Sequence, residues 1–207
     1  MILLITAFGP FPGVPKNPSE ALARQVAADR RWAGLGVTAV VRVFATDYAA
    51  VARLIPAVLG EERPDVVLML GVASRRRHLS VERRAANRAS ILHPDVSGAR
   101  PAGLSLHPGA PAFRPARAPL VAITVAAGRA GFRTKLSRSA GTYLCNASYF
   151  HMLGALPPDR PCLFLHIPNT KGRASRNRLA AAVLAAARLL ARRVRPRVMT
   201  LDPWFRF

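Results

Sequence analysis

The sequence predicts one α/β domain over residues 1–207, a three-layer α/β/α sandwich around a mostly parallel, twisted sheet. Short continuous apolar runs of strand length occur at residues 2–6, 66–70 and 161–168, with segments of helical length between such runs. Strands of this kind are typical of a parallel sheet that helices cover on both faces. The length of 207 residues also fits a single domain with a buried core.

The first part of the chain alternates strands with helices. Its expected elements are a strand at 2–6, a helix at 18–31, a strand at 37–44, a helix at 48–60 and a strand at 66–70. The first helix has the clearest start, because Asn17 can cap it and Pro18 suits its first position. Pro56 is a breaker or a kink inside the second helix. The segment Phe8–Gly13 is too rich in Pro and Gly for regular structure, so we expect a loop carrying two aromatic rings.

The middle of the chain is harder to assign. Residues 71–88 are typical of a basic loop followed by a strand or a short helix, with Glu82 as the single acid. Residues 93–119 contain six prolines and form a long irregular excursion, which in a compact domain is usually functional or mobile. Residues 120–130 fit a strand or a helix. We expect a helix, because a parallel strand at 132–136 needs a crossover before it.

The last part of the chain supplies the remaining elements. They are the strand at 132–136, a helix from Cys145 to Leu153, a strand at 161–168 and a helix at 179–194. The strand at 161–168 carries His166 near its carboxyl end, and we place it parallel and next to the strand that precedes Cys145. The apolar tail Trp204–Phe207 is either docked on the body or a contact for another subunit, and we expect docking.

The amino-acid composition indicates in which cellular compartment the protein is expected and whether a cofactor is expected. Cys145 and Cys162 are the only cysteines, so no disulfide framework is expected, and the predicted location is the reducing cytoplasm. The amino terminus lacks the basic flank of a signal peptide. No apolar run of about 20 residues predicts a membrane span. The spacing of His and Cys residues does not resemble a zinc site, and no metal or other cofactor is expected.

The formal net charge of +21 raises the question of nucleic-acid binding. The charge is spread over the whole chain, however, and it lacks the interleaved aromatic residues that single-strand binders use. Nucleic acid is therefore not the expected partner. The local exception is Arg75-Arg76-Arg77, followed closely by Arg83, Arg84 and Arg88.

A thiol and an imidazole are predicted at one edge of the sheet. Cys145 is expected in the first turn of a helix, where main-chain N–H groups and the helix dipole favour an anion and hence a nucleophilic thiolate. His166 is expected where ligand sites of parallel sheets lie, at the carboxyl end of a strand. With a carboxylate to orient the imidazole, this pair suits thiol acyl transfer. The alternatives are a buried apolar cysteine and a hydrogen-bonded core histidine.

Four blocks carry a resemblance to a known family. They are Ile5-Thr-Ala-Phe-Gly-Pro-Phe11 with Asn17-Pro18-Ser19, Leu70-Gly-Val-Ala73 with Val81-Glu82-Arg83, Ser139-Ala-Gly-Thr-Tyr-Leu-Cys145-Asn146, and Leu165-His-Ile-Pro168. In this order and at this spacing they resemble the pyroglutamyl-peptidase I (pyrrolidone-carboxyl peptidase) family of cytosolic cysteine peptidases. The block around Cys145 is the most specific, and the four together cover most of the chain.

The resemblance implies an exopeptidase that removes N-terminal pyroglutamate (5-oxoproline) from peptides through an acyl-enzyme. It implies that catalysis falls on Cys145, His166 and Glu82. The substrate-binding residues that it implies are Phe8, Phe11, Asn17, Gly71, Val72, Tyr143 and Leu144. Members of such a family often form dimers or tetramers, so a homo-oligomer is expected too.

The sequence departs from the family pattern around the expected pocket. Ser74–Arg77 replaces a Gly-Arg element, and residues 89–98 and 113–119 lose much of the family's pattern. A different thiol amidase or acyl hydrolase therefore remains an alternative, as does a catalytically idle basic binding protein. Because Arg75–Arg77 lie near the expected site, we also expect a preference for acidic residues after the pyroglutamate.

Overall fold

The computed structural model describes residues 1–11 and 14–194, so the expected docking of Trp204–Phe207 lies outside the described residues. Within them, the main sheet has six strands in the order β2-β1-β3-β8-β4-β7. Its strands are β1 (Ile2–Phe8), β2 (Thr38–Phe44), β3 (Val66–Val72), β4 (Leu79–Glu82), β7 (Thr134–Ser137) and β8 (Cys162–Ile167). The helices are α1 (Pro18–Ala27), α2 (Tyr48–Glu62), α3 (Leu120–Arg129), α4 (Leu144–Ala155) and α5 (Arg173–Ala191).

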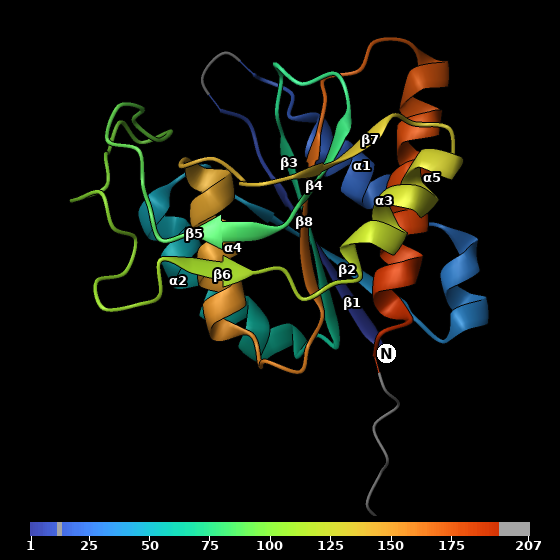
Figure 1. Ribbon diagram of the computed structural model, residues 1–207, viewed down its shortest axis with the longest axis horizontal. Coiled ribbons are helices and arrows are strands. Elements are labelled where there is room, and N and C mark those ends of the chain that lie inside the picture. The colour runs from blue at the N-terminus through green and yellow to red at the C-terminus, as the bar shows by residue number, and fades with distance from the viewer. Residues whose placement is uncertain (12–13, 195–207) are drawn as a thin grey trace, which may run out of the picture.

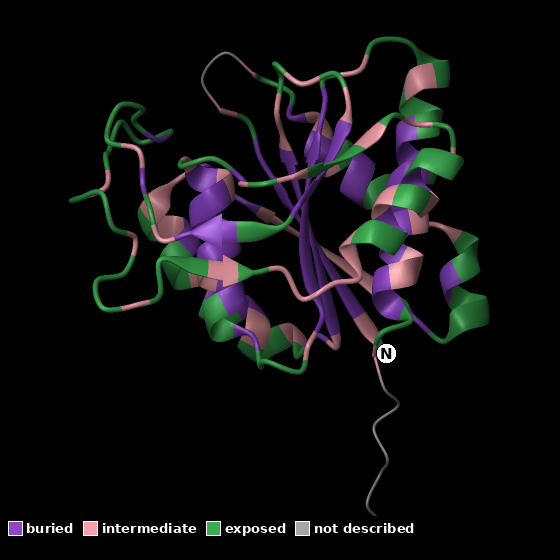
Figure 2. Cartoon of the chain, viewed as in Figure 1, coloured by how far each residue is buried: buried purple, intermediate pink, exposed green. Residues whose placement is uncertain are grey.

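The sheet is the middle of three layers (Figure 1). Helices α1, α3 and α5 pack on one face, and α2 and α4 pack on the other. The central strands β3 and β8 are buried almost throughout, whereas the edge strands β2 and β7 are partly exposed (Figure 2). The predicted three-layer α/β sandwich is therefore confirmed. In the described ranges, no helix is long and apolar enough to cross a bilayer.

The directions of the strands correct one prediction. Strands β1, β2, β3 and β8 run parallel, but β4 is antiparallel to β8, and β7 is parallel to β4. The strand before Cys145 is thus neither a neighbour of the His166 strand nor parallel to it. The reason is that the chain turns back after β3 and enters the sheet reversed as β4. The crossover through α3 then keeps β7 in the direction of β4.

Several boundaries also differ from the predictions. Phe8 belongs to β1, opposite Phe44, and is not part of the loop. The first helix ends at Ala27, because Asp29 accepts a hydrogen bond from the Arg31 main chain and starts a separate 3₁₀ helix, Arg30–Leu35. The regions 71–88 and 93–119 contain β4 and a small antiparallel pair, β5 (Arg84–Ala86) with β6 (Phe113–Pro115).

Helix α4, which carries Cys145, is held at both ends by the segment that contains β5 and β6. At its start, the Asn146 side chain is buried, accepts from the Ala86 N–H and donates to the carbonyls of Ala86 and Arg88. At its end, the Arg117 guanidinium donates to the carbonyls of Leu153, Leu156 and Pro157. A cation there satisfies free carbonyls and complements the helix dipole. These contacts fix the position of the helix relative to the sheet.

Candidate active site

Cys145, His166 and Glu82 lie together at the carboxyl edge of β3 and β8. Cys145 is the second residue of α4 and is partly exposed. The His166 side chain forms a hydrogen bond with the Cys145 side chain. On its other side, His166 Nδ1 lies 2.8 Å from Glu82 Oε1. A carboxylate accepts only, so Nδ1 carries a proton and Nε2 is the nitrogen left for the thiol.

The strand register explains why Glu82 reaches His166. Ser80 of β4 pairs with His166 of β8 in the antiparallel ladder. Residues two apart on a strand share a face, so Glu82 lies diagonally opposite His166 on the side of the sheet that α4 covers. The predicted orienting carboxylate therefore comes from a strand that the sequence left ambiguous.

The charge environment favours the imidazolium form of His166. Burial lowers the pKa of His166, but the charge of Cys145 as a thiolate, the hydrogen bonds to Cys145 and Glu82, and the carboxylate charge of Glu82 outweigh it. Together they raise the pKa to about 9. At neutral pH the ring is thus protonated, and it lies between the Cys145 sulfur and the Glu82 carboxylate.

Arg76 is a second partner of Glu82 that sequence reasoning did not find. Its guanidinium lies 2.6 Å from Glu82 Oε1 and 3.4 Å from Ser137 Oγ. Glu82 is fully buried, and a buried carboxylate is stable only when it is paired and hydrogen-bonded. Arg76 and His166 share this task. Arg76 is therefore paired with Glu82, although its side chain is 30% exposed, and it is not a free cation of the pocket rim.

Gly71 allows the thiol to approach the sheet. A Cβ atom at Gly71 would lie 2.7 Å from Cys145 Sγ and 2.7 Å from the Phe164 ring. Real Cβ atoms do not make contacts so short. Gly71 is also the register partner of His166 in the parallel pair β3–β8. The absence of a side chain at this position thus lets Cys145 lie directly over the strand beside His166.

Gly71→Ala is expected to lower kcat/KM by at least about 100-fold, because the added methyl group displaces Sγ by about 1 Å from its position beside the imidazole. Overpacking against Phe164 should also cost about 1–3 kcal/mol of unfolding free energy. Gly128→Ala is the matched control, since a Cβ there meets no atom within 4 Å. Urea denaturation and amide-hydrolysis kinetics check both variants. Wild-type activity in a folded Gly71→Ala protein would contradict the expectation.

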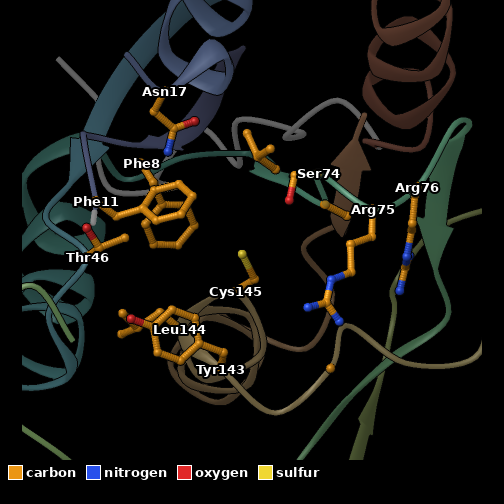
Figure 3. A pocket seen from close by; sticks show the side chains of 13 residues that line it. Phe8, Phe11, Asn17, Thr46, Ser74, Arg75, Arg76, Tyr143, Leu144 and Cys145 are labelled. Carbon is orange, nitrogen blue, oxygen red and sulfur yellow. The ribbon is translucent and has the colours of Figure 1, made fainter. Parts of the chain in front are cut away.

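A mostly apolar cavity of about 510 Å³ opens beside Cys145 (Figure 3). Its lining includes six of the predicted substrate-binding residues, Phe8, Phe11, Asn17, Val72, Tyr143 and Leu144. Gly71, the seventh, lies behind the thiol. In Figure 3, Cys145 stands between the aromatic side chains on one side and Ser74, Arg75 and Arg76 on the other. The cavity therefore has an apolar half and a basic half, with the sulfur between them.

Side-chain hydrogen bonds to the main chain of the surrounding loops hold the apolar half of the cavity in place. Asn17 Oδ1 caps α1 by accepting from the Ser19 main chain, as predicted, while Nδ2 donates to the Gly9 carbonyl. Thr46, which sequence reasoning missed, lines the cavity and donates to the Pro10 carbonyl. A Thr two residues after a strand carries no signal that would have identified it.

The Pro-rich excursion forms part of the cavity surroundings. Tyr143 donates its hydroxyl to the Pro94 carbonyl and packs edge-on against the rings of Tyr48 and His93. Buried Asp95 accepts hydrogen bonds from the main chains of Tyr48, Ser97 and Ala99. The beginning of the excursion is therefore anchored to α2 and to the wall of the cavity.

In the part of the chain that the structure describes, no cluster of three or more His, Cys, Asp or Glu side chains is arranged to hold a metal ion. The site consists of protein groups in a hydrogen-bonded order: thiol, imidazole, carboxylate, guanidinium. A sheet edge with a thiol, an imidazole and a buried carboxylate in this order defines a thiol-dependent hydrolase of the α/β class.

Comparison with known proteins identifies the family of this chain. The chain belongs to the pyroglutamyl peptidase family, whose model matches residues 1–181. It is 36% identical over 171 residues to a pyrrolidone-carboxylate peptidase of Gloeobacter violaceus, covering 81% of this chain and 82% of that protein. It is similar to the crystal structure of the Thermus thermophilus pyrrolidone carboxyl peptidase (31% identity, TM-score 0.81), covering 90% of this chain and 99% of that one. The Bacillus amyloliquefaciens pyroglutamyl peptidase I matches with 25% identity and a TM-score of 0.81, over 92% and 97% of the chains.

Proposed function

We propose that this protein is a cysteine exopeptidase that removes N-terminal pyroglutamate from peptides. The observation that carries the proposal is the hydrogen-bonded order of Cys145, His166 and buried Glu82 beside an apolar cavity. Membership of the pyroglutamyl peptidase family supports the same reaction. In this proposal Cys145 is the nucleophile, His166 is the general acid and base, and Glu82 orients the imidazole.

The first half of the reaction forms an acyl-enzyme. The Cys145 thiolate attacks the carbonyl carbon of the pyroglutamyl residue, and the first N–H groups of α4, which have no acceptor within the helix, stabilise the oxyanion. The imidazolium of His166 then gives its Nε2 proton to the leaving amine as the C–N bond breaks. A thioester between Sγ and the pyroglutamyl group remains.

The second half of the reaction regenerates the thiol. His166, now neutral, takes a proton from a water molecule that attacks the thioester carbonyl. The collapse of this second tetrahedral intermediate breaks the C–S bond and releases pyroglutamic acid, which loses its proton to solvent, while the proton taken from water stays on His166 beside the Cys145 thiolate. The Glu82 carboxylate keeps the proton on Nδ1 throughout, so Nε2 faces the sulfur in each step.

The apolar half of the cavity explains why the enzyme would bind the neutral lactam ring of pyroglutamate. Phe8 and Phe11 supply aromatic walls, and Tyr143 and Leu144 lie across the cavity from them. A neutral lactam suits an apolar slot with a few main-chain hydrogen bonds. An ordinary amino terminus is an ammonium ion, whose burial without a partner is costly. The cavity therefore selects a blocked, uncharged terminus.

Hydrolysis of a pyroglutamyl coumarylamide tests the proposal. We expect release of the fluorophore at a kcat/KM at least about 10³-fold above that of the prolyl coumarylamide, whose ring carries a charged amine and lacks the lactam carbonyl. An acetyl-alanyl coumarylamide separates the alternatives. Its preferential hydrolysis would indicate a different thiol amidase. Failure to hydrolyse any of the three would favour the catalytically idle binding protein.

Location and assembly remain part of the proposal. Both Cys145 and Cys162 are free thiols, and a thiolate nucleophile stays active in a reducing compartment, so we place the enzyme in the cytoplasm. A homodimer or homotetramer remains the predicted assembly. Light scattering of the full chain measures it, and a monomer at micromolar concentration would contradict it.

A further inference from the structure

A second cavity adjoins the active-site cavity on its basic side. It has a volume of about 460 Å³, and Ser74 and Arg76 line both cavities. We call it the basic pocket. Its charged lining residues are Arg76, Arg77, Arg133, Lys171 and Arg178. They come from the segment after β3, from the start of β7 and from the amino-terminal end of α5. Elements far apart in the sequence therefore direct their cations into one hollow.

These positive charges are mostly uncompensated. Arg76 pairs with Glu82, but Arg77, Arg133 and Lys171 form no ion pair with an acidic side chain in residues 1–11 and 14–194. No acidic residue of the described ranges lines the pocket either. Like charges held this close repel one another, which an anion in the pocket would relieve.

Two further observations indicate a positive potential at this place. The first turn of α5 begins after Gly172 without a side-chain cap, and both Lys171 and Ser175 line the pocket, so the positive end of the helix dipole lies beside it. His78 lies directly after Arg77 and immediately before β4. Its pKa is lowered by burial and then by the charges of Lys135, Arg76 and Arg133.

The basic pocket lies on the side of Cys145 where the leaving peptide, the part of the substrate after the scissile bond, would extend. The pyroglutamyl group lies in the apolar half of the active-site cavity, so the peptide that leaves must extend past the sulfur to the other side. Ser74, Arg75 and Arg76 lie on that side (Figure 3), and Ser74 and Arg76 continue into the basic pocket. The chain after the scissile bond is thus directed towards the cations.

We propose that the basic pocket binds a carboxylate of the leaving peptide, so that pyroglutamyl peptides with an anionic group close behind the scissile bond are the preferred substrates. The carboxylate is either the side chain of one of the next two residues or the carboxyl terminus of a short peptide. The proposal rests on the proposed peptidase function. It also divides the roles of the arginine triplet. Arg76 pairs with Glu82, Arg75 lines the cavity mouth, and Arg77 is free to bind the carboxylate.

Matched peptides test the proposal. Pyroglutamyl-Glu-Ala-amide, its Gln counterpart and its Lys counterpart place an anionic, a neutral and a cationic residue after the scissile bond, and Glu and Gln are nearly equal in shape. Pyroglutamyl-Ala and its amide differ only in the terminal carboxylate, so they separate the two sources of the anion. In wild-type enzyme at low salt we expect kcat/KM to be about tenfold higher for at least one anionic member than for its neutral partner. The preference should fall in about 0.5 M NaCl, where charges are screened.

Substitutions in the basic pocket test whether its cations cause the preference for anionic peptides. In Arg77→Gln, the ratio of kcat/KM for the anionic to the neutral peptide should fall by about three- to fivefold, and further when Arg133→Gln is added. Arg53→Gln is the matched control, because it removes one exposed charge from α2 and should leave the ratio unchanged. Both values of a ratio are measured with the same enzyme preparation. A smaller fraction of folded enzyme then lowers both values equally and leaves the ratio unchanged.

The outcomes separate this proposal from the proposed function. Cleavage of neutral pyroglutamyl peptides with equal rates for anionic, neutral and cationic members would overturn the basic-pocket proposal and leave the peptidase intact. A complete lack of pyroglutamyl hydrolysis would overturn both. Oligonucleotide binding that depends on Arg77, together with equal turnover of the peptides, would also overturn the proposal and assign the pocket to nucleic acid.

Discussion

Replacing Cys145 by Ala is expected to abolish hydrolysis of the pyroglutamyl coumarylamide, with a loss of at least about 10⁴-fold in kcat. No other thiol can replace it, because the remaining cysteine, Cys162, is fully buried in β8. The alanine variant should fold normally, since the side chain is partly exposed and its removal leaves little cavity. Release of the fluorophore under single-turnover conditions measures the effect.

Cys162 provides the control for this experiment. Burial raises the pKa of the Cys162 thiol to about 12, so this sulfur is a thiol at every working pH and reacts poorly with alkylating agents. Iodoacetamide should therefore inactivate the native enzyme by modifying Cys145 alone, as peptide mass mapping would show. Cys162→Ala should retain activity. Persistent hydrolysis by the Cys145→Ala protein would exclude the proposed thiol mechanism.

Glu82→Gln is expected to lower kcat by about 10³-fold, because an amide no longer enforces a proton on His166 Nδ1 or stabilises the imidazolium. The pH profile should change as well. The Cys145 thiolate charge and the Glu82 carboxylate together raise the pKa of His166 to about 9 against the effect of burial. Wild-type activity should therefore decline above about pH 9, where the imidazolium loses the proton that the leaving amine requires.

The direction of the change in the variant follows from the same contacts. Glu82 raises the pKa of His166 through both its hydrogen bond and its charge, so the Gln substitution lowers that pKa. The alkaline limb of kcat/KM should move to lower pH. Glu20→Gln is the control, since among the described residues Glu20 pairs with Arg24 alone, on the exposed surface of α1. An alkaline limb that does not move would show that Glu82 does not act through His166.

The layered fold could be predicted because its signals are local. The apolar runs of β1, β3 and β8 have no alternative to burial on both faces. The start of α1 was also predictable, because the cap at Asn17 depends on residues next to one another in the sequence. The direction of β4 and β7 was not, since both are short and their apolar pattern is the same whether they run parallel or antiparallel to their neighbours.

The sequence by itself determined the identity of the chemical groups: a cysteine expected at a helix start, a histidine at a strand end and one acid among arginines. Only the tertiary structure decided how they meet. The thiol reaches the imidazole because α4 is anchored through Asn146 and because Gly71 leaves space beneath the sulfur. Arg76 turns inward to Glu82 while Arg77 lines the basic pocket. Such choices depend on distances between strands and helices that are remote in sequence, which local pattern and charge do not encode.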